Sequence, residues 1–86
     1  MKVKELIEQL KACDQNDIVI MSKDAEGNGF SPLSNADGEN NSYVADSTWS
    51  GDVWLKELTQ EMKDQGFDEE DLAPYGDSCV VLWPIN

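Results

Sequence analysis

The N-terminal part of the chain has an apolar pattern with helical spacing. The stripe consists of Val3, Leu6, Ile7, Leu10 and, at its end, Cys13. Residues three and four positions apart lie on one face of an α-helix. The pattern therefore predicts an amphipathic helix over residues 2–12, followed by a turn at residues 14–17, which are all Asp, Gln or Asn.

Two short continuous apolar runs predict strands. Residues 18–21 are Ile, Val, Ile and Met, and residues 79–83 run from Cys79 to Trp83 before Pro84. Runs of this length and composition are typical of strands buried on both faces. We expect the two runs to lie side by side in the middle of a small sheet, with the first helix covering one face.

The segment between them is rich in Gly, Asn and Asp over residues 23–42, which is too long for an ordinary connection. It predicts a strand or hairpin near residues 30–34 and another strand near residues 42–45. Phe30, Pro32 and Leu33 are its bulky members, and we expect them to pack back onto the sheet.

The last third of the chain combines a strand with two short helical turns. Residues 53–55 follow the turn signal Ser50-Gly51 and predict a strand, although Trp54, Leu58 and Met62 also fit helical spacing. A short helix is predicted over residues 60–65. Its ends are marked by three residues: Thr59 as N-cap, Gly66 as the C-terminal stop, and Asp68 as the cap of a further single turn.

Together these elements predict an α+β fold in one small domain, residues 1–86. An N-terminal amphipathic helix would pack on a small, mainly antiparallel sheet, with a short acidic helix near the C-terminus. Hydrophobic residues make up 40% of the chain, which is enough for a compact core. We expect no signal peptide and no membrane span, because no apolar run approaches the roughly 18 residues that a span needs.

Negative charge is concentrated after residue 23. Fourteen of the 18 acidic residues lie between Asp24 and Asn86, against Lys56 and Lys63, so this stretch carries 2 − 14 = −12, the whole net charge of the chain. Such a field argues against direct contact with nucleic acid or an anionic membrane. It favours a basic protein surface or a cation as partner.

The densest acidic segment spans residues 57–71. Its carboxylates are Glu57, Glu61, Asp64, Asp68, Glu69, Glu70 and Asp71. A solvated face is the ordinary interpretation, and imitation of the DNA phosphate pattern is the sharper one. Among the aromatic residues, Trp49 and Trp54 are candidate anchors for a protein partner, whereas Trp83 is expected in the core.

Catalytic chemistry finds little support in the residue types. The chain has no His and no Arg, which removes Ser-His-Asp and Cys-His catalysis, histidine-containing zinc sites and arginine clamps. Ser78 in the string Gly76-Asp77-Ser78-Cys79 has no histidine to accept its proton, so a turn leading into a strand is the better interpretation. We therefore predict that the protein is not an enzyme.

The loop after the first predicted strand is a candidate calcium-binding site. Asp24, Glu26 and Asn28 occupy positions 1, 3 and 5 of an EF-hand-like loop, with Gly29 at position 6. Position 12 is Asn35 rather than the bidentate Glu that such a loop needs. An Asx- and Gly-rich turn without a metal is the alternative, and no other cofactor is predicted.

Cys13 and Cys79 lack the spacing of a metal site. Two small buried thiols in a reducing cytoplasm are the first interpretation, and a disulfide between the first helix and the last strand is the alternative.

Several segments resemble a small, uncharacterised family of proteins from tailed bacteriophages. The matching pieces are residues 3–10, 18–21, 24–33 and 79–86, which include Glu26-Gly27-Asn28, then Phe30-Ser31-Pro32-Leu33, and the end Val80-Val81-Leu82-Trp83-Pro84. The acidic residues 58–72 fit more loosely, and residues 34–48 contribute little. The resemblance implies a phage source and the cytoplasm of the bacterial host, but no activity and no functional residues.

These observations predict a phage accessory protein that acts by protein–protein contact, as an inhibitor or modulator of a nucleic-acid-binding protein of host or phage. The alternatives are a virion or assembly accessory protein, including a homo-oligomer, and a divalent-cation-binding module.

Overall fold

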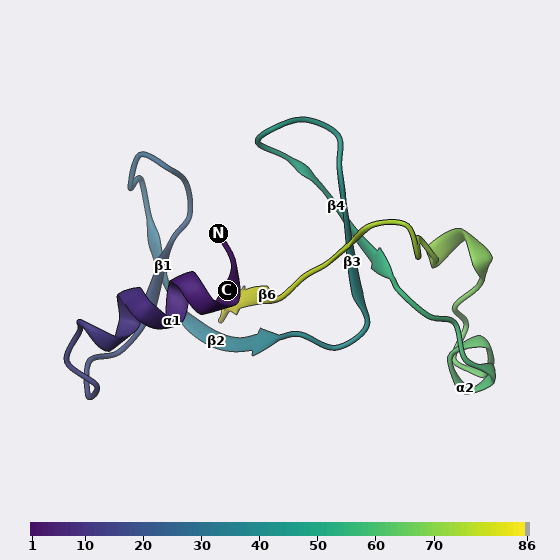
Figure 1. The fold of residues 1–86 in the computed structure, drawn as a ribbon, viewed down its shortest axis with the longest axis horizontal. Coiled ribbons are helices and arrows are strands. Elements are labelled where there is room, and N and C mark those ends of the chain that lie inside the picture. The colour runs from purple at the N-terminus through teal and green to yellow at the C-terminus, as the bar shows by residue number, and fades with distance from the viewer. Residues whose placement is uncertain (86) are drawn as a thin grey trace. The chain divides into compact units, whose positions relative to one another are not determined.

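The computed structural model describes residues 1–85, and these form an α+β protein, as the sequence predicts. In chain order (Figure 1), the elements are α1 (Val3–Lys11), β1 (Ile20–Ser22), β2 (Phe30–Asp37), β3 (Asn41–Ala45), β4 (Gly51–Leu55), α2 (Gln60–Asp64), the 3₁₀ turn η1 (Glu69–Asp71), β5 (Asp77–Ser78) and β6 (Val81–Pro84). The N-terminal helix is accompanied by two small three-stranded sheets, where the sequence predicts a single sheet.

The chain divides into two compact units. Unit 1 consists of Met1–Ala36 and the C-terminal segment that begins at Leu82, and unit 2 consists of Asp37–Val81. Whether residues 1–86 behave as one domain stays a prediction.

Helix α1 of unit 1 confirms the first helix. Lys2 stands at its N-cap without a side-chain hydrogen bond, so the apolar stripe rather than a capping residue explains where the helix begins. At the other end, the Gln15 side chain donates to the carbonyl oxygens of Leu10 (3.0 Å) and Cys13 (2.9 Å). The Leu10 carbonyl also accepts from Cys13 N–H at 3.1 Å, so the Gln15 side chain reinforces the turn that follows the helix.

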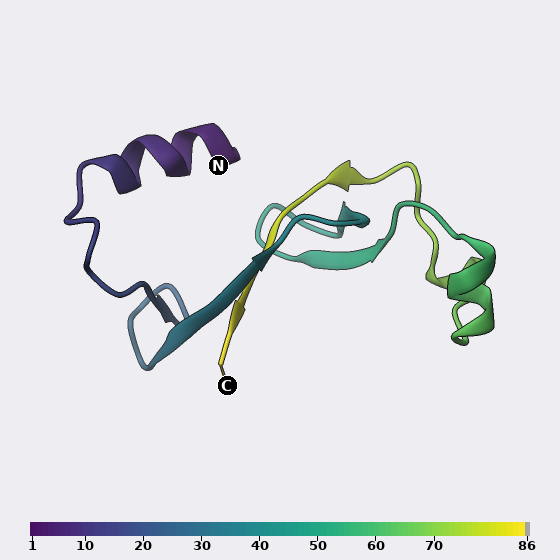
Figure 2. The same ribbon diagram turned by 90° about the horizontal axis from the view of Figure 1, so that it is seen from below.

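The sheet of unit 1 has the order β1-β2-β6. Strands β1 and β2 form an antiparallel hairpin in which Ile20 faces Pro32, and Ile85 N–H donates to the Pro32 carbonyl at 3.0 Å. Figures 1 and 2 show β6 beside β2. The two apolar runs are therefore not neighbours, and that prediction is wrong. The reason is that β2, with eight residues, pairs with its hairpin partner β1 on one edge and leaves its other edge for β6.

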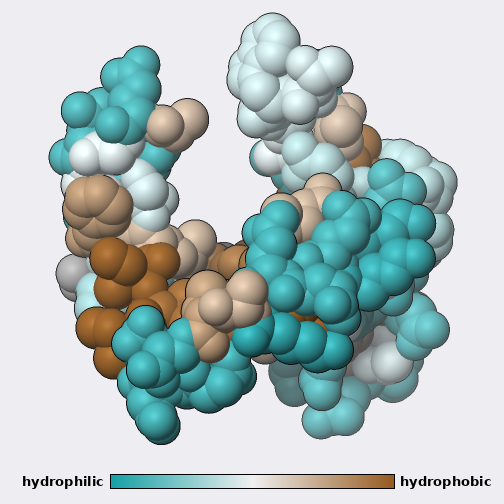
Figure 3. Space-filling model, turned by 60° about the vertical axis from the view of Figure 1, so that its left-hand side comes forward, coloured by the Kyte–Doolittle hydropathy of each residue, from teal (hydrophilic) through white to brown (hydrophobic). Residues whose placement is uncertain are grey.

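Unit 1 also buries less apolar surface than the sequence predicts. Ile18 is 84% exposed, and Val19 and Ile20 are about half exposed, so the prediction of a strand buried on both faces is wrong. Trp83, expected in the core, is also about half exposed. Two of the three strands have only three and four residues, so the sheet is too small to cover both of its own faces. Figure 3 shows hydrophobic side chains, in brown, open on the surface.

The sheet of unit 2 is built on the β3–β4 hairpin. Its register runs from Asn41 opposite Leu55 to Ala45 opposite Gly51, and β5 pairs with the other edge of β3, which gives the order β4-β3-β5. Leu72 forms an isolated parallel bridge with Leu55 at the outer edge of β4. The strands predicted near residues 42–45 and 53–55 are both confirmed.

The centre of unit 2 is a buried polar contact rather than an apolar core. Ser42 is 0% exposed and Ala73 is 2% exposed, and the Ser42 hydroxyl donates to the Ala73 carbonyl. A Cβ atom at Gly76 would lie 2.2 Å from Ser42 Oγ and 2.7 Å from the Tyr43 carbonyl oxygen. The turn over residues 73–76 therefore lies against β3 only because residue 76 has no side chain.

Side-chain hydrogen bonds also fix the segment from β4 to η1. Asn40, at φ +54°, accepts from the backbone N–H groups of Lys56 (3.1 Å) and Glu57 (2.8 Å) through its side-chain oxygen. Thr59 caps α2 by accepting from Met62 N–H at 3.2 Å, and Gly66 follows the helix at φ +106°. The predicted caps at both ends of this helix are thereby confirmed.

Candidate functional site

Almost all of the net charge belongs to unit 2. Within Asp37–Val81 there are 12 acidic residues against Lys56 and Lys63, which gives 2 − 12 = −10. Unit 1 has six acidic residues against four lysines, which gives 4 − 6 = −2. The candidate binding residues Trp49, Trp54 and the seven carboxylates of residues 57–71 all lie in unit 2.

The carboxylates of residues 57–71 face solvent. Six of the seven are exposed, and Asp71 is half-buried. Among the described residues the one ion pair joins Glu8 and Lys11, at 2.9 Å in α1, so no lysine neutralises any of these seven groups. Their field therefore remains available to a partner.

The seven carboxylates divide into two kinds. Three of them hold the local fold: Asp64 accepts from the Gln60 side chain (3.1 Å), Asp68 from Glu70 N–H (2.8 Å) and Asp71 from Asp68 N–H (3.0 Å). Asp68 and Asp71 together form a capping box at η1, which confirms the predicted cap at Asp68. The other four accept no hydrogen bond within residues 1–85 and are free to meet a partner: Glu57, Glu61, Glu69 and Glu70.

Trp49 stands at the tip of the β3–β4 hairpin and is 85% exposed. The loop that carries it is held by its own serines, because Ser47 Oγ accepts from the N–H groups of Trp49 (3.2 Å) and Ser50 (3.1 Å). Asp46 N–H donates to the Ser50 carbonyl at 3.0 Å. An ordered loop with an exposed Trp loses little conformational entropy on binding, as a protein-binding anchor requires.

Trp54 lies in strand β4, away from the hairpin tip, beside a shallow cavity of about 300 Å³. The residues that line it are Asn41, Val53, Trp54, Leu55, Phe67 and Asp71. The cavity thus brings Trp54 and Asp71 together, two residues that the sequence singles out separately. Phe67 is not among the predicted site residues, although a lone aromatic directly after Gly66 in an acidic segment is a signal that could have found it.

The predicted calcium ligands lie in the turn between β1 and β2. Asp24 Oδ1 accepts from Glu26 N–H (2.8 Å) and Asn28 N–H (3.2 Å), and Asp24 Oδ2 accepts from the Asn28 side-chain amide (2.9 Å). The Asn28 side chain and these backbone groups lower the pKa of Asp24. The three residues thus meet as an Asx turn, in which Asn28 directs its donor, rather than an oxygen ligand, toward the carboxylate.

No part of residues 1–85 brings three or more Asp, Glu, Cys or His side chains together in a geometry suited to a metal ion. Calcium binding by Asp24, Glu26 and Asn28 therefore stays a prediction without geometric support.

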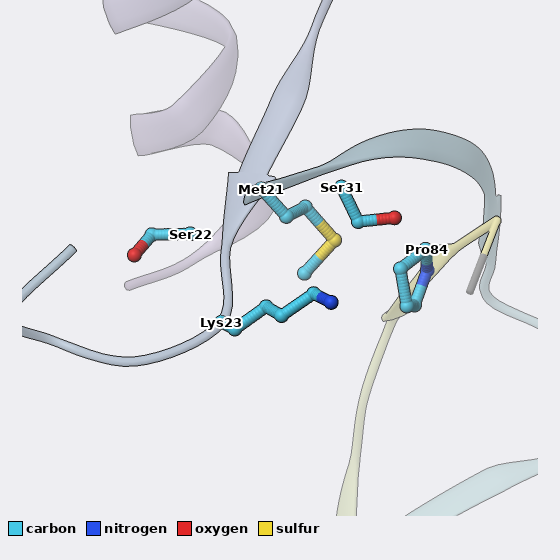
Figure 4. Close-up of a pocket in the computed structure, with 5 residues that line it drawn as sticks. All are labelled: Met21, Ser22, Lys23, Ser31 and Pro84. Atoms are coloured by element: carbon cyan, nitrogen blue, oxygen red, sulfur yellow. The ribbon is translucent and has the colours of Figure 1, made fainter. Parts of the chain in front are cut away.

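A second cavity, of about 330 Å³, lies within unit 1. Figure 4 shows its lining residues, Met21, Ser22, Lys23, Ser31 and Pro84, with the Met21 and Lys23 side chains extending alongside each other. The Ser22 hydroxyl donates to the Asp24 carbonyl, so it is engaged in the β1–β2 turn. The lining offers one amine and no acid–base pair, which gives this cavity no arrangement for general acid–base catalysis.

Both cysteines are free thiols in this structure. Cys13 is exposed, so the prediction that it is buried is wrong, and Cys79 is half-buried. Cys13 belongs to unit 1 and Cys79 to unit 2.

No helix within residues 1–85 has the length and apolar character to cross a membrane.

Comparison of the chain with models of protein families, with curated proteins and with solved structures found no match. The resemblance to a phage protein family therefore stays a prediction, and the functional argument rests on the geometry and charge of the chain itself.

Proposed function

We propose that unit 2 is an acidic protein-binding module and that the chain is a phage accessory protein of the host cytoplasm. In this proposal the module occupies the basic, nucleic-acid-binding surface of a host or phage protein and inhibits or modulates it. The observation that carries the proposal is the row of solvent-facing carboxylates in residues 57–71, none of which is neutralised by a lysine within residues 1–85.

Physical chemistry supports this role in two steps. Several unneutralised carboxylates on an ordered scaffold attract a basic groove over a Debye length, about 8 Å at physiological salt. Trp49 then supplies an apolar anchor on a hydrogen-bonded loop. Charge would thus govern the rate of encounter, and the aromatic contact would govern the lifetime of the complex.

The first test is affinity capture from a lysate of the bacterial host. The immobilised chain is eluted in parallel with a salt gradient and with a duplex DNA oligonucleotide, and the released proteins are identified. Each candidate is then mixed with fluorescent duplex DNA and titrated with the chain. Mimicry requires that the chain displace the DNA from a nucleic-acid-binding protein; binding that DNA leaves unchanged would overturn the proposal.

A matched pair of variants separates specific charge from general acidity. The double substitution Glu69→Gln/Glu70→Gln removes two free carboxylates from unit 2 and leaves the capping box of Asp68 and Asp71 in place. The control Glu5→Gln/Asp17→Asn removes the same charge from unit 1. We expect the first variant to bind roughly tenfold more weakly at low salt and the control to bind as the parent does.

One observation favours a second candidate, a virion or assembly protein that self-associates or binds other subunits. The stripe of α1 keeps Val3, Ile7 and Leu10 about half exposed, and Trp83 in β6 is similarly open. Exposed apolar side chains gathered on one element mark contact surfaces. Detection of the chain in purified particles, at a copy number that matches a structural component, would favour this candidate.

A further inference from the structure

Strand β4 has an open edge. The bond from Lys56 N–H to the Asn40 carbonyl (3.3 Å) shows that Asn41 and Leu55 form a non-hydrogen-bonded pair of the hairpin. The main-chain groups of Leu55 therefore point away from β3, and the Leu55 carbonyl indeed accepts from Ala73 N–H at 2.9 Å.

Val53 has the same orientation as Leu55, because strand residues alternate with a period of two. Its N–H and C=O groups point outward at the edge of the sheet. Beyond the Leu55–Leu72 bridge, no other strand of residues 1–85 pairs with this edge. An exposed edge of this kind accepts an extended polypeptide as an additional strand.

The cavity beside Trp54 adjoins this edge. Val53, Trp54 and Leu55 of β4 line it together with Asn41 of β3. On the outer side, Asp71 of the lining directly precedes Leu72, which bridges Leu55. Trp54 is 38% exposed and Phe67 is 41% exposed, so both residues are partly accessible to a side chain of a partner. Asp71 is a half-buried residue of the same lining; its Oδ2 accepts from Asp68 N–H, and its Oδ1 accepts no hydrogen bond within residues 1–85, so this oxygen can meet a cation.

This lining matches the chemistry of an arginine side chain. A guanidinium group stacks on aromatic rings and pairs with a carboxylate, while its aliphatic stem packs on apolar residues such as Val53 and Leu55. No cationic residue lines the cavity, and the unit around it carries −10. The charge of the surroundings therefore selects a basic occupant over an acidic one.

We propose that an extended, basic segment of the protein partner adds to the outer edge of β4 and places one arginine side chain in the cavity formed by Trp54, Phe67 and Asp71. This inference rests on the proposed function, because it identifies how the partner is held. It assigns recognition to main-chain pairing at Val53 and to arginine at the cavity, in addition to long-range charge.

The test uses a fluorescein-labelled peptide of sequence Lys-Val-Thr-Arg-Thr-Val-Lys and the intact chain, with binding followed by anisotropy. Replacing the central Arg by Lys keeps the charge and should weaken binding about fivefold, because the planar guanidinium stacks on aromatic rings and pairs with a carboxylate through two N–H groups, whereas the Lys ammonium does neither. The peptide is also made in two versions, N-methylated at odd or at even positions. Because only one set of alternate N–H groups can face β4, one version should lose binding at least tenfold and the other should keep it.

Matched variants locate the site on the chain. Phe67→Ala removes a lining ring, and Tyr75→Ala removes an aromatic ring of unit 2 that is 80% exposed and lies outside the cavity lining. We expect Phe67→Ala to abolish the preference for Arg over Lys and Tyr75→Ala to retain it. Amide spectra of both variants verify that each is folded, and in the parent the Val53 amide signal should shift on addition of the Arg peptide.

The outcomes separate this inference from the proposed function. In one outcome, Glu69→Gln/Glu70→Gln weakens the binding of all peptides alike, the Arg and Lys peptides bind with equal affinity, and both N-methylated versions bind equally. The edge-and-cavity inference is then overturned, although an acidic binding module remains. Suppose instead that the peptide preferences appear but no captured protein is displaced from DNA. The proposed function then fails, while the peptide site stands. Concentration-dependent dimers that the Arg peptide does not dissociate would show that a second copy occupies the edge, which also overturns the inference.

Discussion

The two units reach a defined backbone by different means. Unit 2 is held by side chains that bond to the backbone, above all Ser42 beneath the turn over residues 73–76 and Asn40 at the start of the link to α2. Unit 1 relies on strand pairing and on one amphipathic helix, and its side-chain bonds to the backbone, such as those of Gln15 and Asp24, are local to single turns. Its apolar residues stay largely open. In a chain this small, polar contacts can specify a fold where the apolar core is minimal.

The two units also differ in net charge. Unit 2, at −10, must resist repulsion among its own carboxylates. Hydrogen bonds of the Thr59, Asp68 and Asp71 side chains cap α2 and η1, the helical turns that carry many of these carboxylates. Unit 1, at −2, carries little such repulsion. In unit 2 the caps of α2 and η1 hold the backbone where like charges would otherwise open the chain.

The largest expected effect is at Gly76. A methyl group there would overlap Ser42 Oγ and the Tyr43 carbonyl, so Gly76→Ala should lower the free energy of unfolding by roughly 3 kcal/mol, measured by urea unfolding with tryptophan fluorescence. The control is Gly29→Ala in unit 1, where the added atom would meet only the flexible Lys23 side chain at 3.3 Å. Equal stability of the two variants would contradict the polar packing described for unit 2.

Ser42→Ala comes next. The substitution removes one of the two donors to the carbonyl of the buried Ala73, the other being Gly76 N–H, which should cost about 1.5 kcal/mol in the free energy of unfolding. Ser34→Ala, at an exposed position of β2, should change stability by less than about 0.5 kcal/mol. Thermal unfolding followed by circular dichroism measures both, and a loss at Ser34 as large as that at Ser42 would argue against the contrast between the units.

A smaller effect is expected at the cap of α2. Thr59→Ala removes the acceptor for Met62 N–H and should destabilise the protein by about 1 kcal/mol. Thr48→Ala, an exposed residue of the Trp49 loop, is the control and should be nearly neutral. Hydrogen exchange of the Met62 amide should accelerate in the first variant alone; unchanged exchange there would show that the cap does not hold the helix.

The smallest expected effect is a loss of stability of the β1–β2 turn at acid pH. Because hydrogen bonds from Asn28 and Glu26 lower the pKa of Asp24 from its usual 3.8, the ionised carboxylate stabilises the folded turn. This contribution is present above pH 3.8 and is lost as the pH falls through the lower pKa of the folded state. The Asn28 amide resonance should therefore titrate below pH 3.8 in the parent and not in Asp24→Asn. A midpoint at or above 3.8 would contradict the bonding described.

Local elements could be predicted well because their causes are local. The stripe from Val3 to Leu10 predicts α1, and the pair Thr59 and Gly66 predicts the limits of α2. The candidate site could be predicted only in part. Trp49, Trp54 and the acidic segment are visible as residue types, but Phe67 becomes a site residue only through its position beside Trp54 and Asp71. Periodicity describes one element at a time and carries no information on which elements meet.

The sequence by itself thus determined the helices, their caps, most of the strands and the concentration of charge after residue 23. Only the tertiary structure decided that β2 stands between β1 and β6, that Ser42 is buried under the turn before Gly76, and that β4 keeps an open edge. Caps and periodicity act within a few residues, whereas strand order depends on pairing between segments far apart in the chain. Such pairing is set by which backbone edges remain free once the hairpins have closed.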